Sequence, residues 1–265
     1  MPSPLFVLGA GRCGSTLLHE LLAAHPAIAL TNAAGLVYRF WHDSRLAELP
    51  ASAPAGFALH EPGRPHGINH PALIGIAARA CNRHALQAIH EIYAELFPGK
   101  EYRYWGDRLA DPQAAPALAQ VLPDARFVVV TRDPRDLYCA RGAFGEREET
   151  GARELSPAAF CAQYRALYEG LLRDLQPRIL VRYEDLLAAP HAQLGRVLDF
   201  LGLDPTPETT AAAQAAVSAW HGTARSPQAS IGRWRRELLP EEQYVFARDL
   251  VPLLVRFGYE PVATP

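Results

Sequence analysis

Residues 4–26, PLFVLGAGRCGSTLLHELLAAHP, decide the fold of this chain. The run from Pro4 to Gly9 is short, apolar and closed by a glycine, which is typical of a buried strand. Leucines then recur at helical spacing until the pattern stops at His25-Pro26. The stretch therefore predicts a strand, a tight glycine-rich loop and a helix.

The same alternation continues along the chain. Short apolar runs predict further strands at 27–30, 102–105, 126–131 and 179–181. RFVVVT at 126–131 is the clearest, because strands covered on both faces of a parallel sheet are continuous and β-branched. Helical signals follow at 89–96, from Asp111-Pro112, from Asp133-Pro134 and at 194–201. Strands that alternate with helices predict a three-layer α/β/α domain around a central, mostly parallel sheet.

The 265 residues are expected to form a single domain. Residues 50–70 are rich in Pro, Gly, Ala and His and predict a surface excursion, and a polar segment at 221–235 interrupts the helical C-terminal part. The N-terminus does not resemble a signal peptide, and no apolar run is long enough to span a bilayer. We therefore expect a cytoplasmic protein without membrane contact; no signal indicates its oligomeric state.

Composition excludes several classes of protein. Apolar residues make up 49% of the chain and charged residues 20%, which excludes global disorder. The net charge of −2 gives no support to sequence-independent nucleic-acid binding. Of the 26 basic residues, 25 are arginine, whose planar fork suits phosphate or sulfate. The four cysteines lie far apart without CxxC spacing, which predicts reduced thiols and no zinc site.

The glycine-rich loop at 9–16, GAGRCGST, is placed to bind an anion. Between a strand and a helix, backbone N–H groups and the helix dipole favour negative charge. The spacing from Gly9 to Gly14 mimics the P-loop of nucleoside triphosphatases, but Ser15 stands where that motif requires lysine. Arg12 is the loop's cation instead. A close-packed turn without a ligand would also explain the glycines.

A second anion site is predicted after RFVVVT, in the segment from Arg132 to Asp136. Ligands of open α/β sheets bind at the carboxyl ends of the strands. Arg132 stands at such an end, where a charged side chain needs a partner or open water. We interpret it as a binding residue. Asp133 is expected to cap the next helix, and Arg135 and Asp136 are expected to be solvated charges.

Together these segments resemble the sulfotransferases, enzymes that use 3′-phosphoadenosine 5′-phosphosulfate (PAPS) and release adenosine 3′,5′-bisphosphate (PAP). The resemblance runs from residue 5 to about residue 260 and implies a P-loop-like sulfotransferase fold. It implies in-line transfer of the sulfuryl group to a hydroxyl or amine of a small molecule, without a metal. Residues 9–16 are similar to the family's 5′-phosphosulfate loop. The loop residues that would bind PAPS are Gly11, Arg12, Cys13, Gly14, Ser15 and Thr16.

The second site resembles the family's 3′-phosphate site. Arg132 looks like the arginine that grips that phosphate. The serine that usually follows eight residues later is replaced by Ala140, and Arg141 is a possible substitute contact.

Two later segments resemble further parts of the nucleotide site. RYEDL at 182–186 implies that Tyr183 lies beside the adenine or ribose, although a packing tyrosine at a strand edge is an equal alternative. SIGRWR at 230–235 resembles a segment that closes over the nucleotide in the family. Its implied binding and anchoring residues are Gly232, Arg233 and Trp234.

The resemblance also implies catalytic roles. Arg12 would stabilise the charge that grows on the leaving oxygen. Arg108 falls near a lysine that contacts the transferred sulfuryl group in relatives. The relatives' general bases have no counterpart here, and Asp107, which ends a strand beside Arg108, is the first choice for that role. An ion pair would explain Asp107 equally well. The remaining choices are Asp111, His60, His66 and His70.

The acceptor pocket is expected within residues 33–99, where the family varies and where Tyr38, Phe40 and Trp41 could form aromatic walls. A small hydroxylated acceptor, such as a bacterial natural product or a sugar alcohol, would fit. Two alternatives stay open at this point. One is a P-loop kinase or other NTPase, and the other is a PAP- or PAPS-binding protein without catalytic activity.

Overall fold

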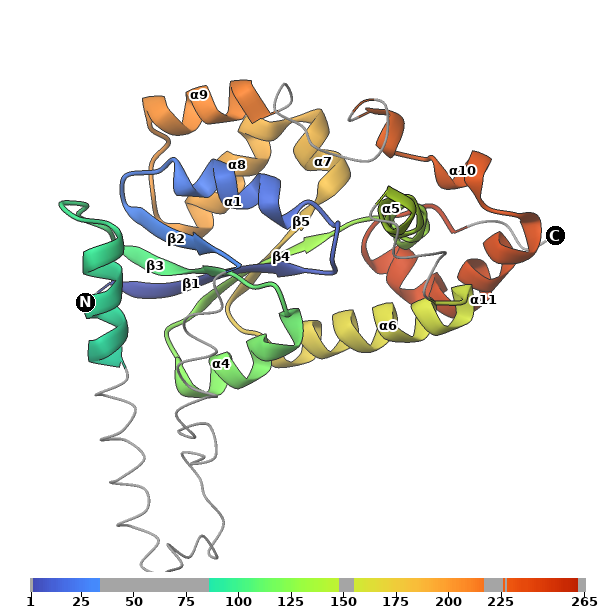
Figure 1. Ribbon diagram of the computed structural model, residues 1–265, viewed down its shortest axis with the longest axis horizontal. Helices are drawn as coiled ribbons and strands as arrows, with labels where there is room; N and C mark the ends of the chain where they lie inside the picture. The colour runs from blue at the N-terminus through green and yellow to red at the C-terminus, as the bar shows by residue number, and fades with distance from the viewer. Residues whose placement is uncertain (1, 34–85, 148–154, 217–225, 227, 262–265) are drawn as a thin grey trace, which may run out of the picture.

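The computed structural model describes residues 2–33, 86–147, 155–216, 226 and 228–261. Within these ranges, five strands form one parallel sheet in the order β2-β3-β1-β4-β5 (Figure 1). The strands are β1 (Ser3–Gly9), β2 (Ile28–Asn32), β3 (Tyr104–Arg108), β4 (Arg126–Thr131) and β5 (Arg178–Arg182). The predicted α/β fold with a central parallel sheet is therefore confirmed.

Helices cover both faces of the sheet (Figure 1). One face carries α1 (Ser15–Ala23), α7 (Tyr183–Ala188), α8 (Pro190–Leu201) and α9 (Pro207–Ala216). The other face carries α4 (Ala115–Val121), α6 (Pro157–Asp174) and α11 (Pro240–Arg256). Beyond the carboxyl ends of the central strands lie α5 (Pro134–Arg147) and α10 (Trp234–Glu237). Short 3₁₀ turns, η2 (Pro112–Ala114) and η3 (Gln228–Ser230), precede α4 and α10.

The central strand shows why the fold has three layers. Leu5 and Val7 of β1 pack in one apolar cluster, with the helices α1 and α8. Phe6 and Leu8 point to the opposite face and pack in a second cluster, with α6 and α11. None of these four side chains is exposed, because alternate residues of a strand face opposite sides and both sides are covered.

The connections that follow β1 and β4 separate at the carboxyl ends of these strands. These two strands are neighbours, but the chain leaves β1 toward α1 on one face and leaves β4 through α5 toward α6 on the other. Where the connections of adjacent parallel strands separate in this way, ligands can enter between them. The rule therefore predicts a ligand site between residues 9–16 and residues 132–136.

Several element boundaries differ from the sequence-based prediction. The strand expected at 102–105 spans Tyr104–Arg108, because its ladder with β1 begins at Tyr104. Asp111 caps a 3₁₀ turn before α4, and its carboxylate accepts the Gln113 N–H at 2.9 Å. The predicted excursion at 50–70 lies outside the described residues, as does most of 217–227. In the part of the chain that is described, no helix is long and apolar enough to cross a membrane.

Candidate functional site

The loop between β1 and α1 has a backbone that requires glycine at two points. A Cβ on Gly9 would lie 2.4 Å from the Val130 carbonyl oxygen and 2.6 Å from the Cys13 sulfur. Gly14 has a φ of 96°, in the left-handed region, and a Cβ there would lie 2.5 Å from the Tyr183 ring. The glycines therefore allow a sharp turn that packs closely on β4 and on the first residue of α7.

The same loop leaves room for an anion. A Cβ on Gly11 would meet no described atom within 4 Å. The N-cap of α1 is Gly14, which has no side chain to cap the helix, and no acidic residue lies in the first turn, so no carboxylate there offsets the positive end of the helix dipole. Arg12 and Thr16 are exposed, whereas Ser15 is buried. The loop thus has the open backbone that an anion-binding turn needs.

Cys13 occupies the loop differently from its neighbours. Its thiol is fully buried against Gly9, and burial raises its pKa to about 11. Its N–H donates to the Ala10 carbonyl oxygen at 3.0 Å. In this conformation both polar groups of Cys13 are directed into the protein, so the residue shapes the loop from the inside.

Arg132 connects this loop with the covering segment, which is defined here as residues 228–237. One guanidinium nitrogen, Nη1, donates to the Arg12 carbonyl oxygen at 3.0 Å, and Nη2 donates to the Ser230 carbonyl oxygen at 2.9 Å. The side chain is 5% exposed, and its Nε has no partner among the described residues. The guanidinium group therefore lies between the two backbone segments, at the carboxyl edge of the sheet where the ligand is predicted to bind.

Tyr183 lies at the centre of the same cluster. Its ring packs on Gly14, and the Arg132 guanidinium lies over it, 4.4 Å from the ring centroid. Its hydroxyl is 2.9 Å from Ser230 Oγ. A single side chain after β5 thus contacts the first loop, the second arginine and the covering segment.

The turn at the start of α5 holds the covering segment. The Asp136 carboxylate accepts the Gly232 N–H at 2.6 Å and the Trp234 N–H at 3.0 Å. The Arg135 guanidinium lies 4.0 Å from the centroid of the Trp234 ring. The covering segment is therefore fixed to α5 by its backbone and by its tryptophan.

The expectation that Arg135 and Asp136 are solvated was wrong, since each is 1% exposed. Both residues have partners inside the protein: Arg135 contacts Asp133 and the distant Trp234, and Asp136 accepts backbone N–H groups of the distant covering segment. Asp133 accepts the Arg135 backbone N–H at 2.9 Å, as predicted for a helix cap, and also pairs with the Arg135 side chain at 2.7 Å. Burial raises the pKa of Asp136 to about 6, aided by the charge of Asp133 and opposed by the two N–H donors and Arg132.

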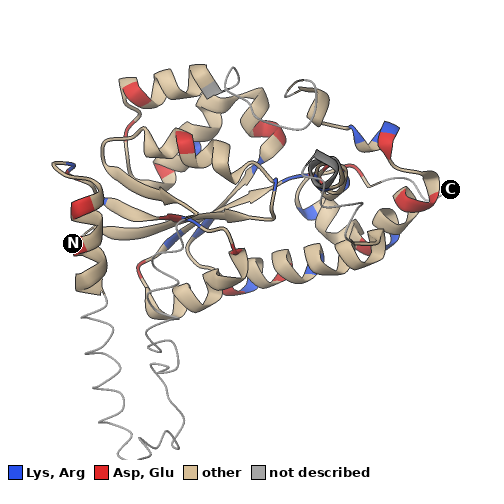
Figure 2. Ribbon diagram, in the orientation of Figure 1, with Lys and Arg blue, Asp and Glu red and all other residues tan. Residues whose placement is uncertain are grey.

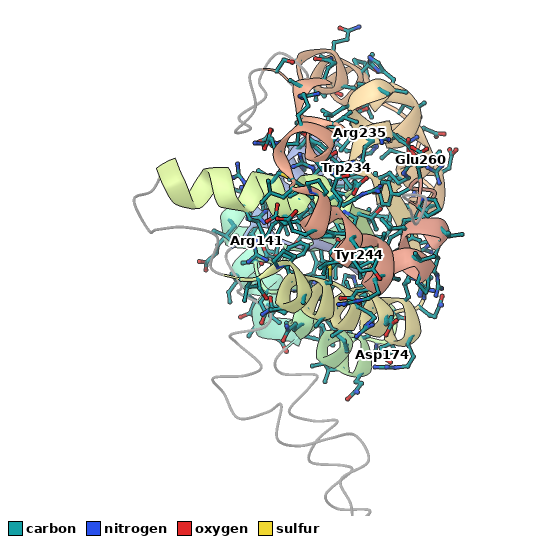
Figure 3. The ribbon with its side chains drawn as sticks, turned by 90° about the vertical axis from the view of Figure 1, so that its right-hand side faces the viewer. Arg141, Asp174, Trp234, Arg235, Tyr244 and Glu260 are labelled. Carbon is teal, nitrogen blue, oxygen red and sulfur yellow. The ribbon has the colours of Figure 1, made fainter. Side chains whose placement is uncertain are left out.

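Two predicted binding arginines have other partners. The buried Arg233 side chain pairs with Glu237 at 2.8 Å, one helical turn away. Arg141 is exposed, and its guanidinium lies 5.8 Å from the Phe160 ring centroid, so it extends toward α6. Figure 3 shows Trp234 beside Arg235, whose guanidinium pairs with Glu260 at 2.8 Å. In Figure 2 part of the connection from β4 to α5 is blue, and the segment from 132 to 136 holds two arginines and two aspartates.

The ends of β2 and β3 form a second group of polar side chains. Asp107 is fully buried, and its Oδ1 accepts the Thr31 hydroxyl at 2.8 Å. Arg108 is half-buried and donates through Nε to the Asn32 side-chain oxygen. His60, His66 and His70 lie outside the described residues. Among those that are described, no group of three His, Cys, Asp or Glu could hold a metal ion.

Comparison with known proteins decides the family. The model of the sulfotransferase family matches residues 4–208, which is more than half of the chain. The chain belongs to the sulfotransferase family. No curated protein matches its sequence.

Solved sulfotransferases share the fold at low sequence identity. A sulfotransferase domain of the olefin synthase of Synechococcus PCC 7002 is 20% identical, with 98% of this chain and 96% of that chain covered and a TM-score of 0.56. The sulfotransferase domain from the curacin biosynthetic pathway is 15% identical, with coverages of 98% and 99% and a TM-score of 0.53. Mouse sulfotransferase SULT7A1, complexed with PAP, is 12% identical, with coverages of 96% and 85% and a TM-score of 0.54.

Sequence reasoning missed three residues of this candidate site. Ser230 contributes its carbonyl to Arg132 and its hydroxyl to Tyr183. Asp136 holds the covering segment. Glu184, buried after β5, accepts the Asp133 N–H at 2.9 Å. Each acts on a partner about 50 or more positions away, so spacing in the sequence gave no signal.

Proposed function

We propose that the chain transfers the sulfuryl group of PAPS to a hydroxyl or amine of a small-molecule acceptor and releases PAP. The observation that carries the proposal is the position of Arg132, which donates to the first loop through the Arg12 carbonyl and to the covering segment through the Ser230 carbonyl. The motif that resembles a 5′-phosphosulfate loop and the arginine that resembles a 3′-phosphate ligand therefore lie next to each other.

The residues present fit a nucleotide with phosphates on both sides of its ribose. The first loop offers an open backbone at Gly11 and a helix N-terminus whose N-cap residue, Gly14, has no side chain. The second loop offers the buried Nε of Arg132, which has no hydrogen-bond partner among the described residues and could donate to a bound anion. The PAP complex of the mouse protein supports this choice of donor, since its fold is the same.

In-line transfer of a loosely held group depends mainly on positioning and on charge stabilisation. Arg12 and the N–H groups of Gly14 to Thr16 would stabilise the negative charge that grows on the leaving oxygen. Arg108, held by Asn32 at the end of β3, would contact the transferred group. Catalysis in this proposal uses no metal, so a chelator should leave the rate unchanged.

Asp107 is our choice for the general base. Its carboxylate is buried and accepts a hydrogen bond from the Thr31 hydroxyl, so contact with an acceptor hydroxyl requires a movement that exposes Asp107. The test is a pH–rate profile of Asp107→Asn beside that of the unmodified protein. Loss of the acidic limb supports the role, and an unchanged limb excludes it.

The activity is tested with purified protein, PAPS and a library of small alcohols and amines, with PAP release and acceptor mass as readouts. Sulfated product without added metal supports the proposal. ATP hydrolysis that needs Mg²⁺, without PAPS consumption, would instead support the kinase or NTPase alternative, which the family match disfavours. Tight PAP binding with no transfer to any acceptor would identify a non-catalytic binding protein.

A further inference from the structure

A tyrosine hydroxyl lies at the end of the ladder between β1 and β4. The last register pair of this ladder is Gly9 with Val130, and beyond it the two chains separate toward opposite faces. At that point the hydroxyl of Tyr168, from α6, accepts the Ala10 N–H at 3.1 Å and donates to the Val130 carbonyl oxygen at 2.8 Å. A side-chain oxygen therefore stands between two backbone groups of neighbouring strands.

The position of this hydroxyl is fixed by packing. Tyr168 is fully buried, with the Tyr164 ring at 4.5 Å and the Phe257 ring at 5.4 Å between centroids. Burial raises its pKa well above the ordinary value, so the hydroxyl keeps the proton that it donates to Val130. The helix α6 thus presents a neutral hydroxyl at a defined distance from both strands.

Tyr164, one turn earlier on α6, holds the second loop. Its buried hydroxyl donates to the Arg132 carbonyl oxygen at 3.0 Å. The Arg132 side chain donates in turn to the Arg12 carbonyl. Two adjacent tyrosines on one helix face therefore hold the beginning of the first anion loop and the beginning of the second.

We propose that Tyr168 is a positioning residue that sets the separation of the two anion loops, while Tyr164 holds the backbone of the second loop. This inference rests on the proposed function, because the separation matters to a ligand that must reach both loops at once. Without the Tyr168 hydroxyl, the Ala10 N–H and the Val130 carbonyl lose their common partner. The strands then move relative to each other, and the two loops no longer match one rigid nucleotide.

The experiment compares a ligand that carries both the 3′- and the 5′-phosphate with two ligands that carry only one of them. Dissociation constants of PAP, adenosine 5′-phosphate and adenosine 3′-phosphate are measured by calorimetry for the unmodified protein and for Tyr168→Phe. We expect PAP affinity to fall at least about tenfold, and each monophosphate affinity to change less than about threefold. Equal losses for all three ligands, or unchanged PAP affinity, would overturn the inference.

Tyr104→Phe is the matched control. Tyr104 is also buried, and its hydroxyl donates to the Leu201 carbonyl oxygen at 2.6 Å, at the other end of the sheet. This variant loses a comparable hydrogen bond and should lower the thermal unfolding temperature without changing the ratio of PAP to monophosphate affinity. A change of that ratio equal to the change in Tyr168→Phe would show that the effect is general and would overturn the inference.

Tyr164→Phe gives an independent test even if Tyr168→Phe does not fold. We expect this variant to lower the affinities for PAP and adenosine 3′-phosphate by the same factor and to leave the affinity for adenosine 5′-phosphate unchanged. Equal weakening of all three ligands would contradict its assigned role. If the unmodified protein binds no PAP, the proposed function and this inference both fail. If it binds PAP and the tyrosine variants match it, only this inference fails.

Discussion

The two loops proposed to bind anions are built in opposite ways. The first, at 9–16, exposes Arg12 and Thr16 and has an open backbone at Gly11. The second, at 132–136, buries every residue, and its charged side chains are bonded to partners within the protein. The first loop is preformed by its backbone, whereas the second depends on side chains whose partners come from three other segments.

This difference separates binding from stability. The exposed residues of the first loop, Arg12 and Thr16, can change without loss of packing, because their side chains lie outside the core. Residues of the second loop join β4 to the covering segment, so the same substitutions there must affect both the ligand and the fold. Substitutions at matched positions of the two loops can test the contrast directly.

The largest expected effect is at the two arginines. Arg12→Ala should lower turnover about 1,000-fold, as for the loss of a group that stabilises developing charge, with little change in unfolding temperature. Arg132→Ala should abolish PAP binding and also lower the free energy of unfolding by about 3 kcal/mol, because the buried Ser230 carbonyl and the partly buried Arg12 carbonyl lose their donor. Steady-state kinetics and denaturant unfolding measure both effects.

Arg248 supplies the control for these arginines. It is an exposed residue of α11 that pairs with Asp249 at 2.7 Å. Arg248→Ala should change neither turnover nor stability by more than a small factor. A stable Arg132→Ala, or an unfolded Arg12→Ala, would remove the contrast between the loops.

A second pair of substitutions compares two glycines of the first loop. Gly14→Ala forces a side chain into the left-handed region and against Tyr183, and should cost at least about 3 kcal/mol of stability. Gly11→Ala meets open space and should leave the free energy of unfolding nearly unchanged. Urea titrations of both variants test this, and equal midpoints would show that the loop is not packed on Tyr183.

The third prediction concerns Asp136. Its folded-state pKa of about 6 is above the ordinary value of an aspartate, so its contribution favours folding at low pH and is lost as the pH rises through about 6. In Asp136→Asn this dependence disappears. The stability of the unmodified protein relative to the variant should therefore fall by roughly 2 to 3 kcal/mol between pH 4 and pH 7. If the free energies of unfolding of the two proteins change equally with pH over this range, the raised pKa of Asp136 is contradicted.

The smallest effect is expected at the contact between Tyr183 and Ser230. Tyr183→Phe keeps the ring on Gly14 and under Arg132 but loses the hydroxyl bond of 2.9 Å. A single neutral hydrogen bond contributes about 1 kcal/mol, so PAP affinity should fall about fivefold. Isothermal titration measures the change, and a loss of 100-fold or more would mean that the hydroxyl itself binds the nucleotide.

The same contrast explains what the sequence could predict. Glycine spacing and apolar runs are local, so the strand, loop and helix of 4–26 and the parallel sheet follow from short-range patterns. The buried state of Arg135 and Asp136 could not be predicted, because their surroundings include Trp234 and Gly232 about 100 positions later. Nor does any periodicity distinguish a tyrosine whose hydroxyl holds a loop from one that only packs.

The C-terminal part of the chain supports the candidate site, although it lies far from the loop residues in the sequence. Tyr259 donates to Glu184 at 3.0 Å, and Glu184 accepts the Asp133 N–H beside the second loop. The family match ends at residue 208, yet this chain of contacts extends about 50 residues further. A domain excised at that point for fusion to another protein would lose the hydrogen bond that Tyr259 donates to Glu184 beside the candidate site. Boundaries for such fusions should therefore lie beyond residue 259.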